Sequence, residues 1–287
     1  MEINQVMVIG AGQMGSGIAQ TAASSGLEVL LYDVEESRAE AGRESIGKRL
    51  KKQVEKERMN DADKERIMRR LAVTTSMEKA SEADVIIEAA VENMDVKKTI
   101  FAQLDAFAPA HAVLATNTSS LSITEIAAET KRPDRVIGMH FMNPVPVMKL
   151  VEVIRGLQTS DATHQTVTAL AESMQKTPVE VQDYPGFVSN RILMPMINEA
   201  VYAVYEGVST PEEIDSVMTL GMNHPMGPLT LADFIGLDTC LYIMETLQDG
   251  FSDPKYRPCP LLKNYVRAGW LGLKSGRGFY QYEGGSS

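Results

Sequence analysis

Six residues near the start of the chain, Gly10-Ala11-Gly12-Gln13-Met14-Gly15, constrain its fold more than any other segment. An apolar run, Gln5 to Ile9, precedes them and a helical pattern, Met14 to Ser25, follows. A second apolar run, Leu27 to Tyr32, then ends at Asp33. A strand, a glycine-rich turn, a helix, a strand and an acid in this order are typical of a βαβ unit that holds a dinucleotide. We therefore expect a Rossmann-type sheet to begin near residue 5.

The glycine motif also predicts which dinucleotide is bound. Gly10 permits the tight turn, Gly12 lets the backbone approach the pyrophosphate, and Gly15 allows close helix packing. The N-terminus of the following helix, at Gln13 and Met14, supplies amide donors and the positive end of the helix dipole. Asp33 would accept a hydrogen bond from the ribose 2′-hydroxyl and would repel a 2′-phosphate, so NAD is favoured over NADP.

The pattern after Asp33 predicts a parallel sheet with one antiparallel portion. After a charged helical excursion near residues 35–70, strands are expected at 71–75, 85–89, 113–117 and 136–140, with helices at 97–107 and 121–129. Such alternation implies a doubly wound sheet covered by helices on both faces. Only a short, proline-containing connection leads to the next strand, 149–154, which should therefore pair antiparallel with its predecessor. A helix at 161–176 and a strand at 179–181 complete this domain.

Asp183-Tyr184-Pro185-Gly186 marks the expected domain boundary, because proline and glycine interrupt regular structure and the remainder is helical in pattern. The fold class is thus α/β: a Rossmann-type NAD-binding domain over residues 1–184 and a smaller all-α domain for substrate binding and dimerisation over residues 185–287. Helices are expected at 187–205, 211–220, 229–247 and 261–268. The first of them is apolar on more than one face, which favours a homodimer through this domain, with a local core or a domain interface as the alternatives.

Composition argues against several classes of function. The formal charge of −10 disfavours nucleic acid as a partner. No apolar run reaches the length of a membrane span and no basic leader is visible, so we expect a cytoplasmic protein without a membrane partner. The two cysteines, Cys240 and Cys259, have no metal-ligand spacing, and we expect neither a disulfide framework nor a metal site.

One segment departs from the acidic balance. Lys48, Lys52 and Lys56 repeat at intervals of four, which places them along one helical face. This face is either an ordinary solvated surface or a binding site for an anionic ligand.

His140 is the histidine best placed for acid–base chemistry, because it ends a strand of the parallel sheet and ligands bind outside the carboxyl ends of such strands. A hairpin centred near Pro146 would place Glu152 directly opposite His140. A carboxylate there would fix the imidazole tautomer and stabilise the imidazolium. The alternative is a structural ion pair.

Two further groups could hold a substrate oxygen near His140. The segment Asn117-Thr118-Ser119-Ser120 follows the preceding strand, although Ser119 or Ser120 could instead cap the next helix. Asn190, just past the domain boundary, either brings a donor into the cleft or serves packing.

Together these motifs resemble the L-3-hydroxyacyl-CoA dehydrogenase family over essentially the whole chain. The resemblance rests on the glycine motif and on the segments 88–93, 117–121, 140–145, 183–191 and 272–280. Met142, where an aromatic residue is common in relatives, is a mild departure.

The resemblance implies reversible NAD-dependent oxidation of an (S)-3-hydroxyacyl-CoA, with 3-hydroxybutyryl-CoA as the expected substrate. It implies His140 as the acid/base, Glu152 as its orienting partner, and Ser119 and Asn190 as ligands of the substrate oxygen. Ser45 and Lys52 would meet coenzyme A, which favours the ligand-binding interpretation of the basic face. The implied contacts of the nicotinamide and its ribose are Glu92, Lys97, Asn117, Ser119, Asn143 and Lys274.

Two alternatives stay open. A dehydrogenase of a free hydroxy acid would keep the nucleotide site without using the basic face. A non-catalytic, crystallin-like NAD-binding protein would have no need to keep the four residues around His140 together.

Overall fold

In the computed structural model, residues 3–282 of the 287-residue chain are described. The chain divides into two compact units, Met1–Asp183 and Tyr184–Ser287. No helix within residues 3–282 is long and apolar enough to cross a membrane.

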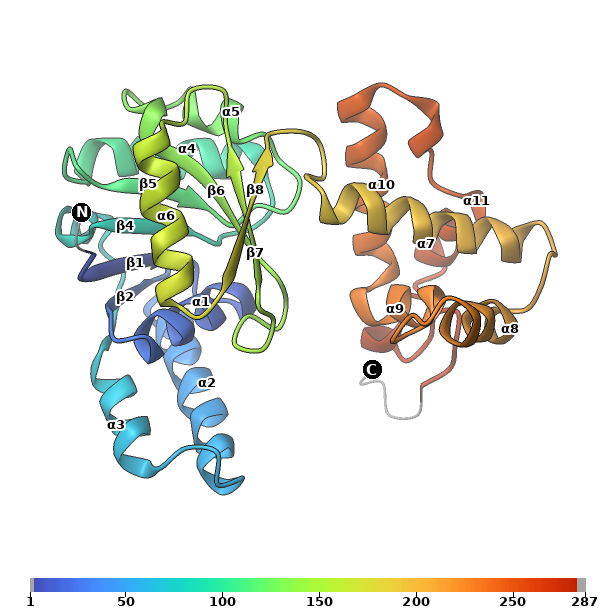
Figure 1. Ribbon diagram of the computed structural model, residues 1–287, viewed down its shortest axis with the longest axis horizontal. Coiled ribbons are helices and arrows are strands. Elements are labelled where there is room, and N and C mark those ends of the chain that lie inside the picture. Colours follow the sequence, from blue (N-terminus) through green and yellow to red (C-terminus); the bar gives the residue numbers. More distant parts are fainter. Residues whose placement is uncertain (1–2, 283–287) are drawn as a thin grey trace. The chain divides into compact units, whose positions relative to one another are not determined.

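The first unit is built on one eight-stranded sheet (Figure 1) with the strand order β3-β2-β1-β4-β5-β6-β7-β8. Every neighbouring pair is parallel except β6 and β7, which are antiparallel as the short connection predicts. The strand order reverses between β1 and β4, and dinucleotides bind at such a switch point. The strands are β1 Gln5–Ile9, β2 Glu28–Tyr32, β3 Leu71–Thr74, β4 Val85–Glu88, β5 Val113–Thr116, β6 Val136–Phe141, β7 Leu150–Arg155 and β8 Thr177–Gln182.

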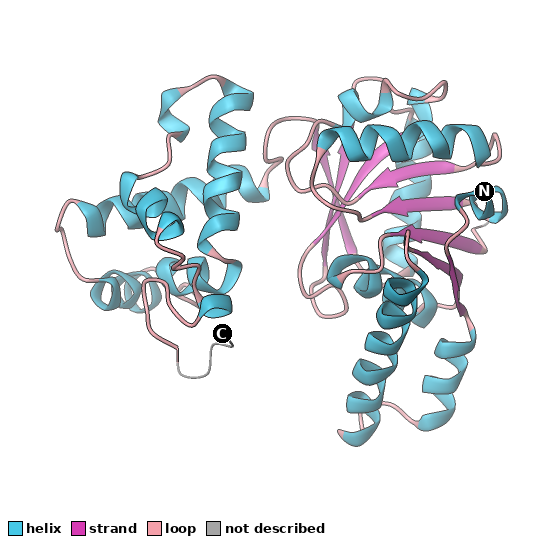
Figure 2. Ribbon diagram, turned by 180° about the vertical axis from the view of Figure 1, so that it is seen from behind, coloured by secondary structure: helices cyan, strands magenta, loops and turns pink. Residues whose placement is uncertain are grey.

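Helices cover both faces of this sheet, with α6 on one face and α4 on the other (Figures 1 and 2). The expected excursion consists of α2 and α3, which lie side by side and extend beyond the strands. Two 3₁₀ segments, η1 Met77–Glu82 and η2 Pro133–Arg135, complete the connections. The helices are α1 Gln13–Ser24, α2 Glu36–Glu55, α3 Asp61–Arg69, α4 Met94–Phe107, α5 Ile123–Ala127 and α6 Asp161–Ser173.

The helix expected over residues 121–129 is shorter than predicted. The hydroxyl of Ser122 accepts a hydrogen bond from the backbone N–H of Glu125 and so starts α5 at Ile123. Capping by Ser119 or Ser120, the alternative considered from the sequence, is therefore wrong.

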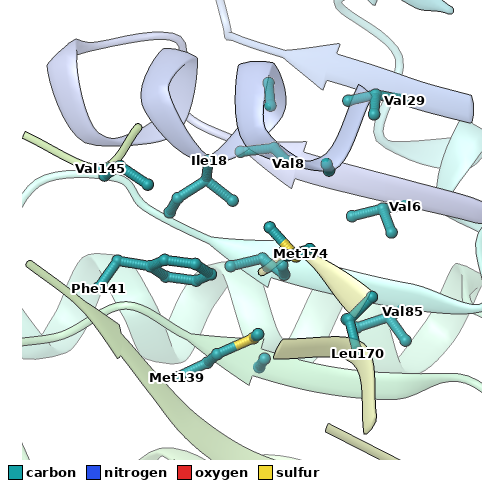
Figure 3. Close-up of a cluster of buried hydrophobic side chains, with 14 of the residues drawn as sticks. Val6, Val8, Ile18, Val29, Val85, Met139, Phe141, Val145, Leu170 and Met174 are labelled. Carbon is teal, nitrogen blue, oxygen red and sulfur yellow. The ribbon is translucent and has the colours of Figure 1, made fainter. Parts of the chain in front are cut away.

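A core of alternating strand residues and helix faces fixes the strand that carries His140 (Figure 3). Met139 and Phe141 are fully buried in this core, where they join Ile18 of α1 and Leu170 of α6. Because successive strand residues point to opposite faces, His140 lies on the other face of β6. The packing of its two neighbours therefore limits how far the backbone at His140 can move.

The second unit is helical, and three of the four predicted helices differ from the observed bounds by two residues or more. Gly236, with φ +102°, divides the helix expected over 229–247 into two. Phe187 has φ +52°, so the first helix begins only at Ser189, and the second continues past Ser216 as a π-helical turn, η3. The elements are α7 Ser189–Tyr205, α8 Pro211–Ser216, η3 Val217–Gly221, α9 Pro228–Ile235, α10 Leu237–Phe251, η4 Pro254–Tyr256, α11 Pro260–Arg267 and η5 Leu273–Ser275.

A buried carboxylate, Asp233, holds the C-terminal segment onto these helices. It accepts hydrogen bonds from the backbone N–H groups of Phe279 and Tyr280 and from the hydroxyl of Tyr282. The chain approaches so closely that a Cβ added at Gly278 would lie 2.0 Å from the Asp233 Oδ1. The glycine is therefore needed for this contact.

Candidate active site

His140 and Glu152 lie directly opposite each other in the antiparallel pair of β6 and β7, so the predicted hairpin register is confirmed. The imidazole Nδ1 is 2.8 Å from the Glu152 Oε2, and the two residues are 8% and 2% exposed. An ionised carboxylate can only accept, so this contact requires Nδ1 to carry the proton. The bond fixes both the tautomer and the orientation of the ring.

Two asparagines connect this hairpin to the rest of the nucleotide-binding edge. The Asn117 Oδ1, just past β5, accepts from the backbone N–H of Phe141 at 2.9 Å. The Asn143 Oδ1, just past β6, accepts from the Gln13 Nε2 at 3.1 Å. The structure thus joins the strand of His140 to the glycine motif through side chains that the sequence assigns to cofactor binding.

Glu92 organises the segment that carries Ser119. Its Oε1 accepts from the Thr118 hydroxyl at 2.6 Å and from the backbone N–H and hydroxyl of Ser119 at 2.8 and 3.1 Å. Its Oε2 is 3.4 Å from the Lys97 ammonium. Burial by itself raises the pKa of Glu92, but the charge of Lys97 and the hydrogen bonds from Thr118 and Ser119 outweigh burial, and the net shift is downward. Glu92 is therefore ionised at neutral pH.

A buried carboxylate that the sequence analysis did not select, Glu88, anchors this arrangement. Lys97 donates to both its oxygens, at 2.7 and 2.9 Å, and the hydroxyl of Thr116 donates to Oε2 at 2.6 Å. Glu88 and Lys97 are both fully buried. The signal in the sequence was an acid that closes the otherwise apolar strand Val85–Glu88, nine positions before a lysine.

The glycine motif borders a cavity of about 1170 Å³ that also contacts Asp33, Ser45 and Arg49. A Cβ at Gly10, which has φ +98°, would lie 2.6 Å from the Ala89 carbonyl oxygen, and one at Gly15 would lie 1.8 Å from the Gly10 oxygen. Around Gly12, by contrast, no atom of the described residues beyond its two chain neighbours lies within 4 Å of an added Cβ. The first and third glycines are thus required by packing and the second leaves its backbone open, which fits the approach of a pyrophosphate.

Asp33 and the basic face flank this cavity. The Asp33 Oδ2 accepts from the backbone N–H of Ala11 at 2.9 Å, which fixes the carboxylate beside the glycine motif. Ser45 lines the cavity, whereas Lys52, two turns further along α2, is exposed. Between them Arg49, which the sequence analysis also missed, donates to Ser45, Gln20 and Ser16. Burial lowers the pKa of its guanidinium.

Two predicted site residues belong to the second unit. Asn190 is a buried residue of α7, and the Lys274 ammonium lies 2.6 Å from the Asp238 Oδ1. Their contacts with substrate and nucleotide stay predictions. In the described part of the chain, no group of three or more His, Cys, Asp or Glu could hold a metal ion.

Comparisons with known proteins cover both units. Residues 5–184 match the NAD-binding domain of 3-hydroxyacyl-CoA dehydrogenase, and residues 186–282 match its C-terminal domain. A Bacillus subtilis protein named "Probable 3-hydroxybutyryl-CoA dehydrogenase" is 64% identical over 283 residues, which cover 99% of each chain. The 3-hydroxybutyryl-CoA dehydrogenase of Bradyrhizobium diazoefficiens is 51% identical over 98% of this chain and 96% of its own.

A solved structure agrees with these relatives. The (S)-3-hydroxybutyryl-CoA dehydrogenase of Ralstonia eutropha superimposes with a TM-score of 0.96 at 51% identity, covering 98% of this chain and all of that one. On these matches, the chain belongs to the 3-hydroxyacyl-CoA dehydrogenase family and carries that family's NAD-binding domain.

Proposed function

We propose that this protein interconverts (S)-3-hydroxybutyryl-CoA and acetoacetyl-CoA, with NAD as the hydride carrier. The named activities of its relatives support the substrate. The observation that carries the chemistry is the buried contact of His140 with Glu152, on a strand that Asn143 joins to the glycine motif.

The glycine motif would hold NAD, which would supply the hydride acceptor for C3 of the substrate in the oxidative direction. His140 takes the hydroxyl proton on Nε2, since Glu152 keeps the Nδ1 proton in place. The carboxylate of Glu152 then balances the charge of the imidazolium. In the reductive direction, protonated His140 returns the proton to the C3 oxygen.

The remaining roles complete this proposal. Ser119 and Asn190 hold the C3 oxygen and stabilise the charge that develops there. Ser45 and Lys52 bind the coenzyme A portion of the substrate. Two observations support this: Ser45 lines the nucleotide cavity, and Lys52 is open to solvent. The nicotinamide and its ribose meet Glu92, Lys97, Asn117, Ser119, Asn143 and Lys274.

The acid–base roles are tested with His140→Ala and Glu152→Gln. We expect kcat for acetoacetyl-CoA reduction to fall by about 10³- to 10⁴-fold for His140→Ala and by about 10²-fold for Glu152→Gln. The affinity for NADH, measured from the fluorescence of the bound nucleotide, should change little. His164→Ala is a matched control, because His164 also pairs with a glutamate, Glu180, at 3.3 Å, but on the polar helix α6. Wild-type turnover by His140→Ala would remove His140 from the mechanism.

The substrate class is tested at the basic face. We expect Lys52→Ala to raise KM for acetoacetyl-CoA several-fold, because a cation near a phosphate is lost. Lys51→Ala, which removes a lysine paired with Glu55, should leave KM unchanged. Equal rates with free acetoacetate and with acetoacetyl-CoA would support a free hydroxy acid as substrate. No NADH oxidation with any acyl-CoA would support the non-catalytic alternative.

We also propose that the protein is a cytoplasmic homodimer that associates through its second unit. Several large apolar side chains of that unit are exposed, which supports an interface there.

A further inference from the structure

We propose that Arg38 is a latent binding residue for the 2′-phosphate of NADP, and that Glu35 suppresses it by neutralising its charge. Glu35 then acts with Asp33 to set the preference for NADH over NADPH. The inference rests on the proposed function, since it concerns the nucleotide cavity of the same enzyme.

The first observation is where Arg38 lies. Asp33, Val34 and Arg38 all line the cavity that the glycine motif borders. They belong to one short segment that runs from the end of β2 into the first turn of α2. Asp33 is held there by the Ala11 N–H, at the position where a carboxylate meets the ribose 2′-hydroxyl. Arg38 is therefore in the part of the cavity where a 2′-phosphate would lie, and an arginine near this position is what accommodates that phosphate in NADP-binding sheets.

The second observation is the partner of Arg38. Its Nη2 lies 2.9 Å from the Glu35 Oε1, and the two side chains are 63% and 55% exposed. Ion pairs this exposed are weak, so Glu35 competes with a phosphate for the guanidinium only modestly, by about fivefold at most, and does not block the contact. A phosphate would offer the guanidinium a stronger, bidentate contact. Glu35 itself does not line the cavity.

The third observation separates Arg38 from the other arginine of the cavity. Arg49 donates to Gln20, Ser45 and Ser16, so its guanidinium is fixed between α1 and α2. Arg38 has no such anchors in the described structure beyond Glu35. Of the two arginines that line the cavity, Arg38 is thus the one free to turn toward a new anion.

The test is a double-mutant cycle read as the ratio of kcat/KM with NADPH to kcat/KM with NADH, using acetoacetyl-CoA as substrate. Glu35→Gln should raise this ratio about fivefold, the most that an exposed ion pair supports, with the NADH value unchanged. Glu36→Gln is the matched control, because it removes the same charge one residue away without touching the pair. It should change the ratio less than about twofold. In Glu35→Gln/Arg38→Gln the gain should disappear.

Two results would overturn the inference. Equal gains from Glu35→Gln and Glu36→Gln would mean that only the local negative charge matters. A gain that survives in the double variant would mean that Arg38 does not take the phosphate. If wild-type rates with NADPH are too slow to measure, the same variants are made in an Asp33→Asn background, which removes the carboxylate that repels the 2′-phosphate. Failure of the inference leaves NADH oxidation intact, whereas failure of the proposed function abolishes it in the wild type.

Discussion

At the scale of single residues, the charges around Ser119 depend on one buried cation. Lys97 lies between two carboxylates, with both oxygens of Glu88 within 3 Å and Glu92 at 3.4 Å. A lysine is rarely fully buried unless it is paired, and here the pairing is double. Its charge keeps Glu92 ionised, and Glu92 in turn binds the backbone and hydroxyl of Ser119. The position of a proposed substrate ligand is thus set by a residue in a different element.

We predict that Lys97→Met destabilises the protein by about 3–5 kcal/mol, because it leaves buried carboxylates without a counter-charge while nearly preserving volume. Urea unfolding measures this. Lys98→Met is the control: the adjacent lysine pairs with Glu125 and Glu129 and is far less buried, so its loss should cost at most about 1 kcal/mol. Equal losses for the two variants would contradict the buried network.

The lowered pKa of Glu92 predicts how stability responds to acid. A carboxylate whose pKa is lower in the folded than in the unfolded protein stabilises the fold above its usual pKa of 4.5, and this contribution is lost as the pH falls below that value. The difference in unfolding free energy between wild type and Glu92→Gln should therefore stay constant above about pH 5 and shrink as the pH falls from 5 towards 3. A difference that stays constant or grows over this lower range would show that Glu92 is not stabilised in its ionised form.

Single-residue contacts could be predicted from the sequence where the pairing of two adjacent strands determines which residues lie opposite each other. The short connection predicts an antiparallel pair of β6 and β7, and a hairpin centred near Pro146 places His140 opposite Glu152, as the structure has them. Glu88 was missed because its role depends on Lys97, which reaches it from α4, and no spacing rule covers a strand and a helix packed across a sheet edge. Arg49 was missed for the same reason, since two of its partners, Gln20 and Ser16, lie on α1.

At the scale of elements, the hairpin that carries His140 and Glu152 is held by a lysine on the next helix–strand connection. Lys176, between α6 and β8, donates from Nζ to the carbonyl oxygens of Val145 and Met148, at 2.5 and 2.8 Å. It is almost fully buried, and burial lowers the pKa of its ammonium. Both carbonyls belong to the connection of β6 and β7, which also carries Asn143.

We predict that Lys176→Met lowers the free energy of unfolding by about 1–3 kcal/mol, since backbone acceptors lose their donor. The loosened connection should also raise KM for NADH through Asn143, with a smaller effect on kcat. Lys149→Met removes an exposed lysine of the same connection and should change stability by less than about 0.5 kcal/mol. An unchanged KM for NADH in Lys176→Met would limit Lys176 to a structural role.

Element prediction succeeded in the sheet and was less exact among the helices of the second unit. Alternating strands and helices leave little choice of topology, whereas a glycine inside a helical pattern can be either tolerated or a break. Gly236 is a break, because its φ of +102° lies outside the helical range, and the apolar periodicity of residues 229–247 continues through it. Periodicity reports which side chains are buried and does not report where the backbone turns.

At the scale of the whole molecule, the structure changes the reason for expecting a dimer. The apolar character of α7 suggested one from the sequence, but Met194, Ile197 and Val201 of that helix are buried in the core of their own unit. Five exposed large apolar side chains of this unit instead lie between residues 205 and 222, around the end of α7 and in the π-helical turn: Tyr205, Val208, Val217, Leu220 and Met222. Others are exposed outside this segment, among them Ile192 of α7 and Phe234 of α9. The sequence alone does not separate the buried apolar residues of this unit from the exposed ones, because burial depends on how its helices pack.

We predict that this segment forms the dimer interface, and that Val217→Glu/Leu220→Glu converts the protein into a monomer. Association would bury two carboxylates that have no partner. The free energy lost by removing them from water exceeds what an interface of ordinary size gains. Light scattering on a sizing column should give twice the chain mass of 31.5 kDa for the wild type and the single mass for the variant. Leu157→Glu is the control, because Leu157 is as exposed as Leu220, 85% against 88%, but belongs to the first unit. A double variant that keeps the dimer mass while folded, as judged by circular dichroism, would place the interface elsewhere, and a wild-type mass of 31.5 kDa would remove the dimer altogether.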